Sequence, residues 1–115
     1  MKIFNGKVLI AGNGKICKDW FSKARGLMFS SGLKKGQALI LVADKESVME
    51  SSIHMLFVFQ WIDVVWLDRN KNVVDFKRNV KPFTILIMPK KPAKYVVELP
   101  KGGISNINIG DNFIF

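Results

Sequence analysis

The chain has 115 residues, of which 49% are hydrophobic and 23% charged, and it carries a formal net charge of +9. This composition is typical of an ordered globular protein, and the length predicts one domain, residues 1–115, with its own core. A single cysteine and a single histidine exclude an internal disulfide and supply too few ligands for a structural zinc site. We therefore expect neither a metal nor a cofactor.

The positive charge is concentrated in two parts of the chain. Residues 1–36 carry +7 and residues 71–101 carry +6, whereas residues 37–70 carry −3. Fifteen of the eighteen cationic residues are lysines, which suit a solvated surface or loose phosphate contacts better than base reading. No apolar run is long enough to span a bilayer, and no signal peptide is recognisable. We expect a cytoplasmic protein without membrane contacts, either monomer or homodimer.

The first third of the chain predicts short strands and one helix. Residues 2–11 are β-like and are interrupted at Asn5-Gly6, a strong turn signal, so they predict a small hairpin or a bent edge strand. Asp19 is placed to cap a short helix over residues 19–25, which Gly26 ends. The apolar run at residues 38–43 has the length of a strand, and the polar residues 44–52 predict a loop or one helical turn.

The most apolar part of the chain is residues 53–68. It predicts a strand at 53–59, a bend at Gln60-Trp61 and a second strand at 62–67. Neither strand has a clean period of two, which indicates burial on both faces. Residues 68–72 have the composition of a hairpin turn, and residues 73–76 form the returning strand.

The remaining elements are also strands. We expect them at 84–88 and 95–99, followed by a tail from 104 to 115 that turns at residues 110–112 and ends within the sheet. Many short strands with turns between them predict an all-β, mainly antiparallel fold. The expected architecture is a compact β-sandwich, jelly-roll-like or barrel-like, with one short helix near residues 19–25.

Two residues of the apolar stretch are candidates for chemistry. Asp63 lies in an apolar strand and needs partners there, either backbone N–H groups at the bend or a cation such as Arg25. A general base or ligand-binding acid is the alternative to this structural role. His54 is the one side chain that titrates near neutral pH by default, and Asp63 is its natural orienting partner if the two strands face each other. We favour structural roles for both.

Other candidates surround this pair. Arg25 is predicted to pin the short helix to the sheet through Asp63 or Glu98, with anion binding as the alternative. Trp20, Trp61 and Trp66 are candidates for lining a ligand pocket, among which Trp66 suits the core and Trp61 suits a partly exposed contact.

A basic run interleaved with aromatic residues gives an argument for nucleic acid. Cations beside stacking aromatics are how sheet surfaces hold single strands, although lysine-rich surfaces also serve solubility. The cations are Lys77, Arg78, Lys81, Lys90, Lys91 and Lys94, and the aromatics are Phe76, Phe83 and Tyr95.

Four ordered motifs resemble the family called domain of unknown function 192. They are Ala24-Arg25-Gly26-Leu27-Met28-Phe29, the segment from His54-Met55 through Ile62 to Asp68, Tyr95 to Pro100 with Gly102-Gly103, and Gly110-Asp111. The chain is similar to an archaeal-type member, because many bacterial members have Trp-Met-Lys-Asn where it has residues 54–57, so no role of that Lys-Asn pair carries over. The resemblance implies a compact, jelly-roll-like β-sandwich and no established activity.

Three functions follow, in order of preference. The first is a non-enzymatic binding domain for an unknown small ligand or protein partner. Its candidate residues are Arg25, His54, Trp61, Asp63 and Glu98. The second is a nucleic-acid-associated protein that binds weakly through the lysine-rich strands. The third is a hydrolase-like enzyme that uses His54 and Asp63.

Overall fold

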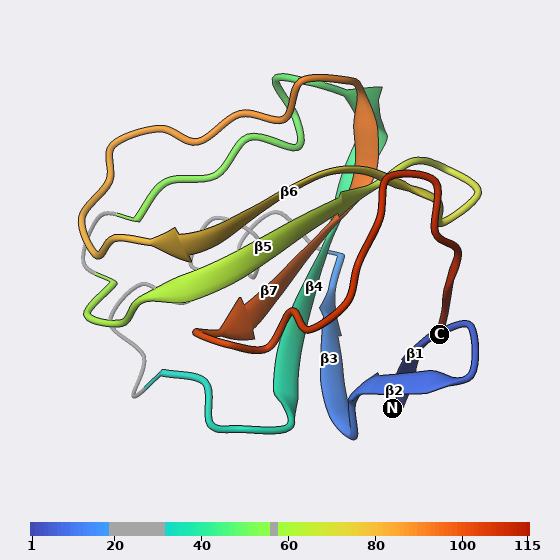
Figure 1. Cartoon of the computed structure of the whole chain (residues 1–115). Helices are drawn as coiled ribbons and strands as arrows, with labels where there is room; N and C mark the ends of the chain where they lie inside the picture. Colours follow the sequence, from blue (N-terminus) through green and yellow to red (C-terminus); the bar gives the residue numbers. More distant parts are fainter. Residues whose placement is uncertain (19–31, 56–57) are drawn as a thin grey trace.

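The strands of the protein form two sheets (Figure 1). The computed structural model describes residues 1–18, 32–55 and 58–115, and every regular element in these ranges is a β-strand. The predicted helix at residues 19–25 lies outside the described residues. The strands are β1 (Ile3–Asn5), β2 (Val8–Ala11), β3 (Asn13–Cys17), β4 (Gln37–Ser47), β5 (Ile62–Leu67), β6 (Val73–Val80), β7 (Ala93–Pro100) and β8 (Phe113–Ile114).

The smaller sheet has the order β2-β1-β8 and joins the two ends of the chain. The predicted hairpin at Asn5-Gly6 is confirmed: β1 and β2 are antiparallel, and Gly6 has a φ of 60°, which a glycine adopts without strain. The expectation that the C-terminal tail ends within the sheet is also confirmed, since β8 pairs with β1. Phe113 is buried there.

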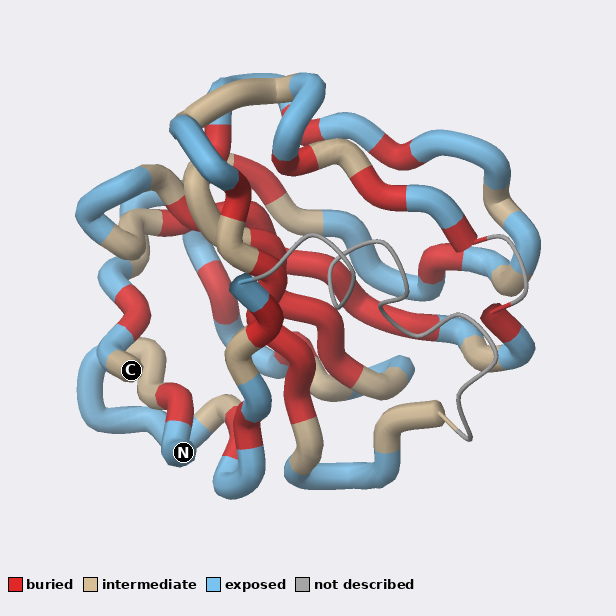
Figure 2. Tube along the Cα trace, turned by 180° about the vertical axis from the view of Figure 1, so that it is seen from behind, coloured by how far each residue is buried: buried red, intermediate tan, exposed pale blue. Residues whose placement is uncertain are grey.

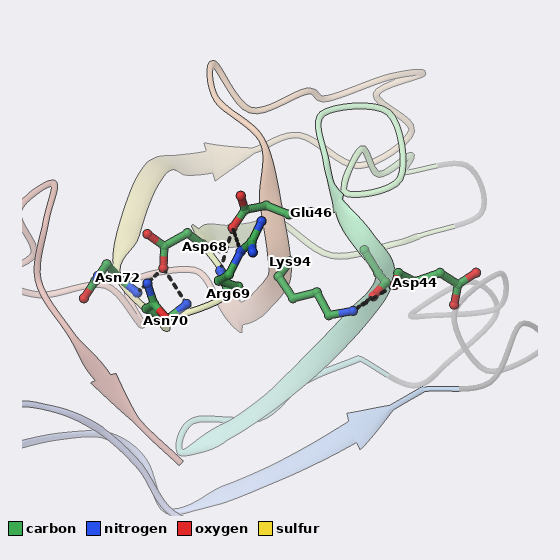
Figure 3. A network of polar contacts seen from close by, with 8 residues as sticks. Asp44, Glu46, Asp68, Arg69, Asn70, Asn72 and Lys94 are labelled. Carbon is green, nitrogen blue, oxygen red and sulfur yellow. Dashed lines mark hydrogen bonds and ion pairs between the residues drawn. The ribbon is translucent and has the colours of Figure 1, made fainter.

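The larger sheet has the order β3-β4-β7-β5-β6. Strand β5 has the predicted bounds, and every one of its residues is buried. The predicted turn at residues 68–72 joins β5 to β6, where the Asp68 carboxylate accepts hydrogen bonds from the backbone N–H groups of Asn70 and Asn72, each 2.9 Å long. Figure 3 shows these contacts beside the Arg69–Glu46 pair, which ties the turn to the far end of β4.

Two details of the expected architecture are wrong. Strands β3 and β4 are parallel, so the larger sheet is mixed and departs from a jelly roll. The two sheets also do not close into a barrel, because β3 and β6 end the larger sheet at opposite edges.

Each face of the larger sheet covers its own hydrophobic cluster. One face, here called the sandwich face, packs against the smaller sheet, and its cluster includes Ile40, Val65, Leu67, Val97 and Leu99 together with Ile3 and Phe113. The opposite face, here called the ribbon face, includes Leu39, Leu41, Val64, Trp66 and Val96 together with Ile53, Met55, Val58 and Ile87. Coverage on both sides explains why β5 lacks an alternating pattern.

Two irregular segments, residues 53–55 and 83–88, cover the ribbon face and are here called the ribbon. They run side by side at the upper left of Figure 1, and the backbones of Ile53 and Ile87 exchange hydrogen bonds of 3.0 and 2.8 Å. The backbone N–H of Met55 donates to the carbonyl of Thr84, and the carbonyl of Met55 accepts from the N–H of Phe83. The strands predicted at 53–59 and 84–88 are wrong in the described residues. The two segments share a single isolated bridge there, between Ile53 and Ile87. Pro82 and Pro89 flank the second segment and remove two backbone donors.

Candidate binding surface

Asp63 is a structural tether. Its side chain is 1% exposed, and its carboxylate accepts hydrogen bonds from the backbone N–H groups of Asn79 (2.9 Å), Gly102 (3.1 Å) and Ile104 (3.2 Å). Backbone N–H groups were one predicted alternative, but they were expected at the bend at residues 60–61 and come instead from β6 and the turn after β7. Arg25, the other alternative, lies outside the described residues. The carboxylate thus fixes the end of β6 and the turn that follows β7.

His54 lies on the ribbon and is exposed. The donors to Asp63 are backbone groups, so the structure does not build the His54–Asp63 pair that a hydrolase mechanism needs. Three backbone N–H groups occupy most of the acceptor sites of this buried carboxylate, which favours a structural role. The hydrolase hypothesis stays a prediction.

Trp61 lies beside the turn after β7, whereas Trp66 belongs to the core. Trp61 is exposed, and the ammonium of Lys101 lies 5.3 Å from its ring centroid, a cation–π contact. Trp66 is fully buried, and its indole N–H donates a 2.8 Å hydrogen bond to the backbone carbonyl of Ser51. The predicted division between the two side chains is confirmed, and Trp20 lies outside the described residues.

The ribbon and the residue Phe59 expose five large apolar side chains, here called the ribbon surface. They are Phe59, Phe83, Ile85, Leu86 and Met88. Their exposed fractions run from 44% for Met88 to 76% for Ile85. Figure 2 shows buried and exposed residues in close succession along both segments, since one side of the ribbon packs on the sheet. So many exposed apolar groups on one irregular element are typical of an interaction site.

The basic run divides into two groups. Lys77, Arg78 and Lys81 line a groove of about 360 Å³ between β6 and the ribbon, together with Leu86. Lys94 instead donates hydrogen bonds to the backbone carbonyls of Ala43 and Asp44 (Figure 3). The groove is positively charged, since Lys77, Arg78 and Lys81 line it and none of its lining residues is acidic. The other two cations of the run, Lys90 and Lys91, do not line it.

Glu98 is a buried carboxyl group on the ribbon face. Its side chain lies on β7 between Leu39 of β4 and Val64 of β5, and it is 4% exposed. Burial raises its pKa to about 7. Within the part of the chain that the structure describes, the Glu98 carboxyl has no hydrogen bond or ion pair. Near neutral pH this group is therefore close to half protonated.

The sequence did not predict that most residues of the ribbon surface are exposed. Phe83 was predicted only as an aromatic neighbour of lysines, Phe59 was assigned to a buried strand, and Ile85, Leu86 and Met88 were assigned to a strand. Two signals were available: the acid-free run over residues 76–97, and the prolines on both sides of residues 83–88. Two absences complete the description of residues 1–18, 32–55 and 58–115. They contain no group of three His, Cys, Asp or Glu side chains that could hold a metal ion, and no helix suited to crossing a membrane.

Fold and surface together define a two-sheet β protein with an apolar ribbon beside a basic groove. The chain belongs to the DUF192 family, described as "Uncharacterized ACR", whose model matches residues 6–115. The UPF0127 protein of Thermococcus sibiricus is 38% identical over 112 residues, which are 96% of this chain and 66% of that protein. The UPF0127 protein PF1050 of Pyrococcus furiosus is 37% identical over 84% of this chain and 81% of its own length. The chain thus spans about two thirds of the length of the first of these relatives.

Two solved structures share the fold. A protein of unknown function from Novosphingobium aromaticivorans superposes with a TM-score of 0.74 at 19% identity, covering 89% of this chain and 74% of that one. A putative transcription regulator from Sinorhizobium meliloti gives a TM-score of 0.79 at 17% identity, covering 88% and 79%. At these identities the similarity concerns the fold alone.

Proposed function

We propose that the protein is a non-enzymatic binding domain that holds an acidic, partly apolar protein segment on its ribbon surface. The observation that carries this proposal is the exposure of Phe59, Phe83, Ile85, Leu86 and Met88. Leaving such side chains in water forgoes roughly 1.5–3 kcal/mol for each one that folding or binding could bury. A partner that covers them recovers part of this free energy.

Charge selects an acidic partner. Lys77 and Lys81 line the groove beside the ribbon, and the run over residues 76–97 carries no acid to neutralise them. Acidic side chains reaching these lysines would speed association and fix the orientation of the bound segment.

Shape selects an extended peptide. The groove between β6 and the ribbon measures about 360 Å³ and has Leu86 on its wall. An extended segment can lay alternate side chains into such a groove, whereas a planar lipid surface cannot fill it. Aliphatic side chains such as Ile85 can also pack against the apolar side chains of a protein, whereas a nucleic acid offers few aliphatic groups.

Selection from a random peptide display library tests the proposal. We expect enrichment of peptides that combine Asp or Glu with Leu, Ile or Phe, and we expect their affinity to fall as NaCl concentration rises. The triple variant Phe59→Ser, Phe83→Ser, Leu86→Ser should bind these peptides at least about tenfold more weakly.

The matched control replaces three equally exposed apolar residues elsewhere. Val8, Ile109 and Ile114 lie outside the ribbon, and their triple replacement by Ser should leave peptide affinity unchanged. The proposal fails if no peptide is enriched, or if the enriched peptides bind the ribbon variant as well as the wild type.

Single-stranded nucleic acid is the second candidate. The rings of Phe59 and Phe83 meet edge to face, with centroids 5.2 Å apart, and exposed aromatic faces near Lys81 could stack on bases. Fluorescence anisotropy with a mixed-sequence oligonucleotide should then show binding that weakens steeply with salt. Absence of binding at low salt would eliminate this candidate and leave the peptide proposal unaffected.

A further inference from the structure

A second candidate site lies away from the ribbon, where three segments meet. They are the corner from β2 into β3, the turn that enters β4 and the turn that leaves β7. Together they enclose a pocket of about 450 Å³, lined by residues 9–12, 35–37 and 99–103. This volume lies within the range typical of sites for small ligands.

The pocket has apolar walls and a cationic rim. Leu9, Leu99 and Pro100 supply apolar surface, whereas Lys35 and Lys101 are exposed and supply positive charge. None of the lining residues is acidic. A ligand that suits this lining combines an apolar body with one anionic group.

The wall formed by residues 99–103 is held in place by Asp63. Its carboxylate accepts hydrogen bonds from the N–H groups of Gly102 and Ile104, and the N–H of Gly103 donates to the carbonyl of Pro100 at 2.8 Å. A Cβ added at Gly103 would meet the Cβ of Leu99 at 2.7 Å, so the turn is tightly packed. The wall is therefore ordered before a ligand arrives, which lowers the entropy cost of binding.

We propose that this pocket binds a small organic carboxylate with an apolar body, that Lys35 and Lys101 pair with the carboxylate, and that Asp63 acts as a positioning residue. Lys101 lies over the Trp61 ring and can exchange this cation–π contact for an ion pair with the ligand. The site is separate from the ribbon surface, and the inference does not depend on the proposed peptide binding.

Calorimetric titration with three probes tests the chemistry. Octanoate carries both the apolar body and the carboxylate, 1-octanol carries the body alone, and inorganic phosphate carries charge alone. We expect octanoate to bind at least about tenfold more tightly than either of the others. Equal binding of octanoate and 1-octanol would overturn the role of the lysines, and equal binding of phosphate would overturn the role of the apolar walls.

Lysine variants and NMR place the site. Lys35→Met and Lys101→Met should each weaken octanoate binding about tenfold, whereas Lys91→Met, an exposed lysine outside the pocket, should not. Octanoate should shift the amide signals of Gly36, Gly102 and Gly103 in a heteronuclear correlation spectrum. Shifts confined to residues 83–88, or lysine variants without effect, would overturn the assignment of the pocket.

Asp63→Asn tests the positioning role. The variant keeps one carbonyl oxygen as an acceptor, so it should fold, but the turn at residues 102–104 loses part of its support. Octanoate affinity should fall while the preference for octanoate over 1-octanol is retained, because both lysines remain. An unchanged affinity in the folded variant would remove Asp63 from the site.

Discussion

The larger sheet buries three acids, Asp63, Asp75 and Glu98, and two of them, Asp63 and Glu98, lie on opposite faces in opposite surroundings. On the sandwich face, Asp63 is satisfied by three backbone N–H groups, and the covering layer is a regular sheet. On the ribbon face, Glu98 lies between two apolar side chains, and the described part of the covering layer is an irregular ribbon. The contacts of the sandwich face stabilise the fold. On the ribbon face, burial of the Glu98 carboxyl costs free energy, and the ribbon that covers this face exposes apolar side chains to solvent.

The largest expected effect comes from removing the acid of the sandwich face. Asp63→Ala leaves three buried N–H donors without their acceptor, so we expect the free energy of unfolding to fall by about 4 kcal/mol. Equilibrium unfolding in urea measures this loss. Asp63→Asn, which keeps one acceptor oxygen, should lose less. A loss below that of an ordinary surface substitution would contradict the tether.

The second effect comes from Glu98 on the ribbon face and depends on pH. The pKa of Glu98 is raised from 4.5 to about 7 by burial, so between these values the folded state binds more protons than the unfolded state. The contribution of the Glu98 carboxyl to the free energy of unfolding is therefore fully present below pH 4.5. It falls by about 3 kcal/mol as pH rises toward 7 and then levels off.

Glu98→Gln provides the control for this prediction. The neutral amide does not titrate, so the difference in unfolding free energy between the two proteins should vary with pH from 4.5 to 7, while contributions from other acids cancel. A difference that stays constant over this interval would show that the Glu98 carboxyl titrates alike in the folded and unfolded states.

The third effect concerns how the ribbon is anchored. Trp66→Phe removes the hydrogen bond to the Ser51 carbonyl and leaves a small cavity, at a cost of about 2 kcal/mol. Because Ser51 lies two residues before the ribbon, hydrogen exchange at the amides of Ile53 and Ile87 should speed up more than exchange within β5. Uniform acceleration throughout the protein would mean that the two faces do not open separately.

The sequence predicts the regular part of this molecule well, for local physical reasons. The turns at residues 5–6 and 68–72 contain residues that favour hairpins, and β5 has its predicted bounds because a strand buried on both faces is a continuous apolar run. Backbone donors for Asp63 were predicted as one alternative, since a carboxylate in an apolar strand must find donors, but their positions at residues 79, 102 and 104 were not.

The ribbon could not be predicted in the same way. Residues 83–88 are as apolar as a core strand, and composition does not reveal that Ile85 and Leu86 point away from the sheet. The parallel pairing of β3 with β4 is likewise a consequence of tertiary packing, since it joins residues 24 positions apart along the chain, as Asn13 and Gln37 are. Exposure depends on which elements cover a segment, and this is settled by the fold as a whole.

The smallest effect is expected at a contact that belongs to neither face. The Glu46 carboxylate accepts a 2.8 Å hydrogen bond from the backbone N–H of Arg69 and lies 3.5 Å from its Nε, on an exposed edge. The pKa of Glu46 is lowered, chiefly by that backbone N–H, so its contribution is present above the ordinary pKa and is lost as pH falls. Arg69→Ala keeps the backbone donor, so it should change thermal stability less than Glu46→Gln does, and 1 M NaCl should reduce the difference between wild type and Arg69→Ala. If either variant cost as much as Asp63→Ala, burial would not be what separates the strong contacts of this protein from the weak ones.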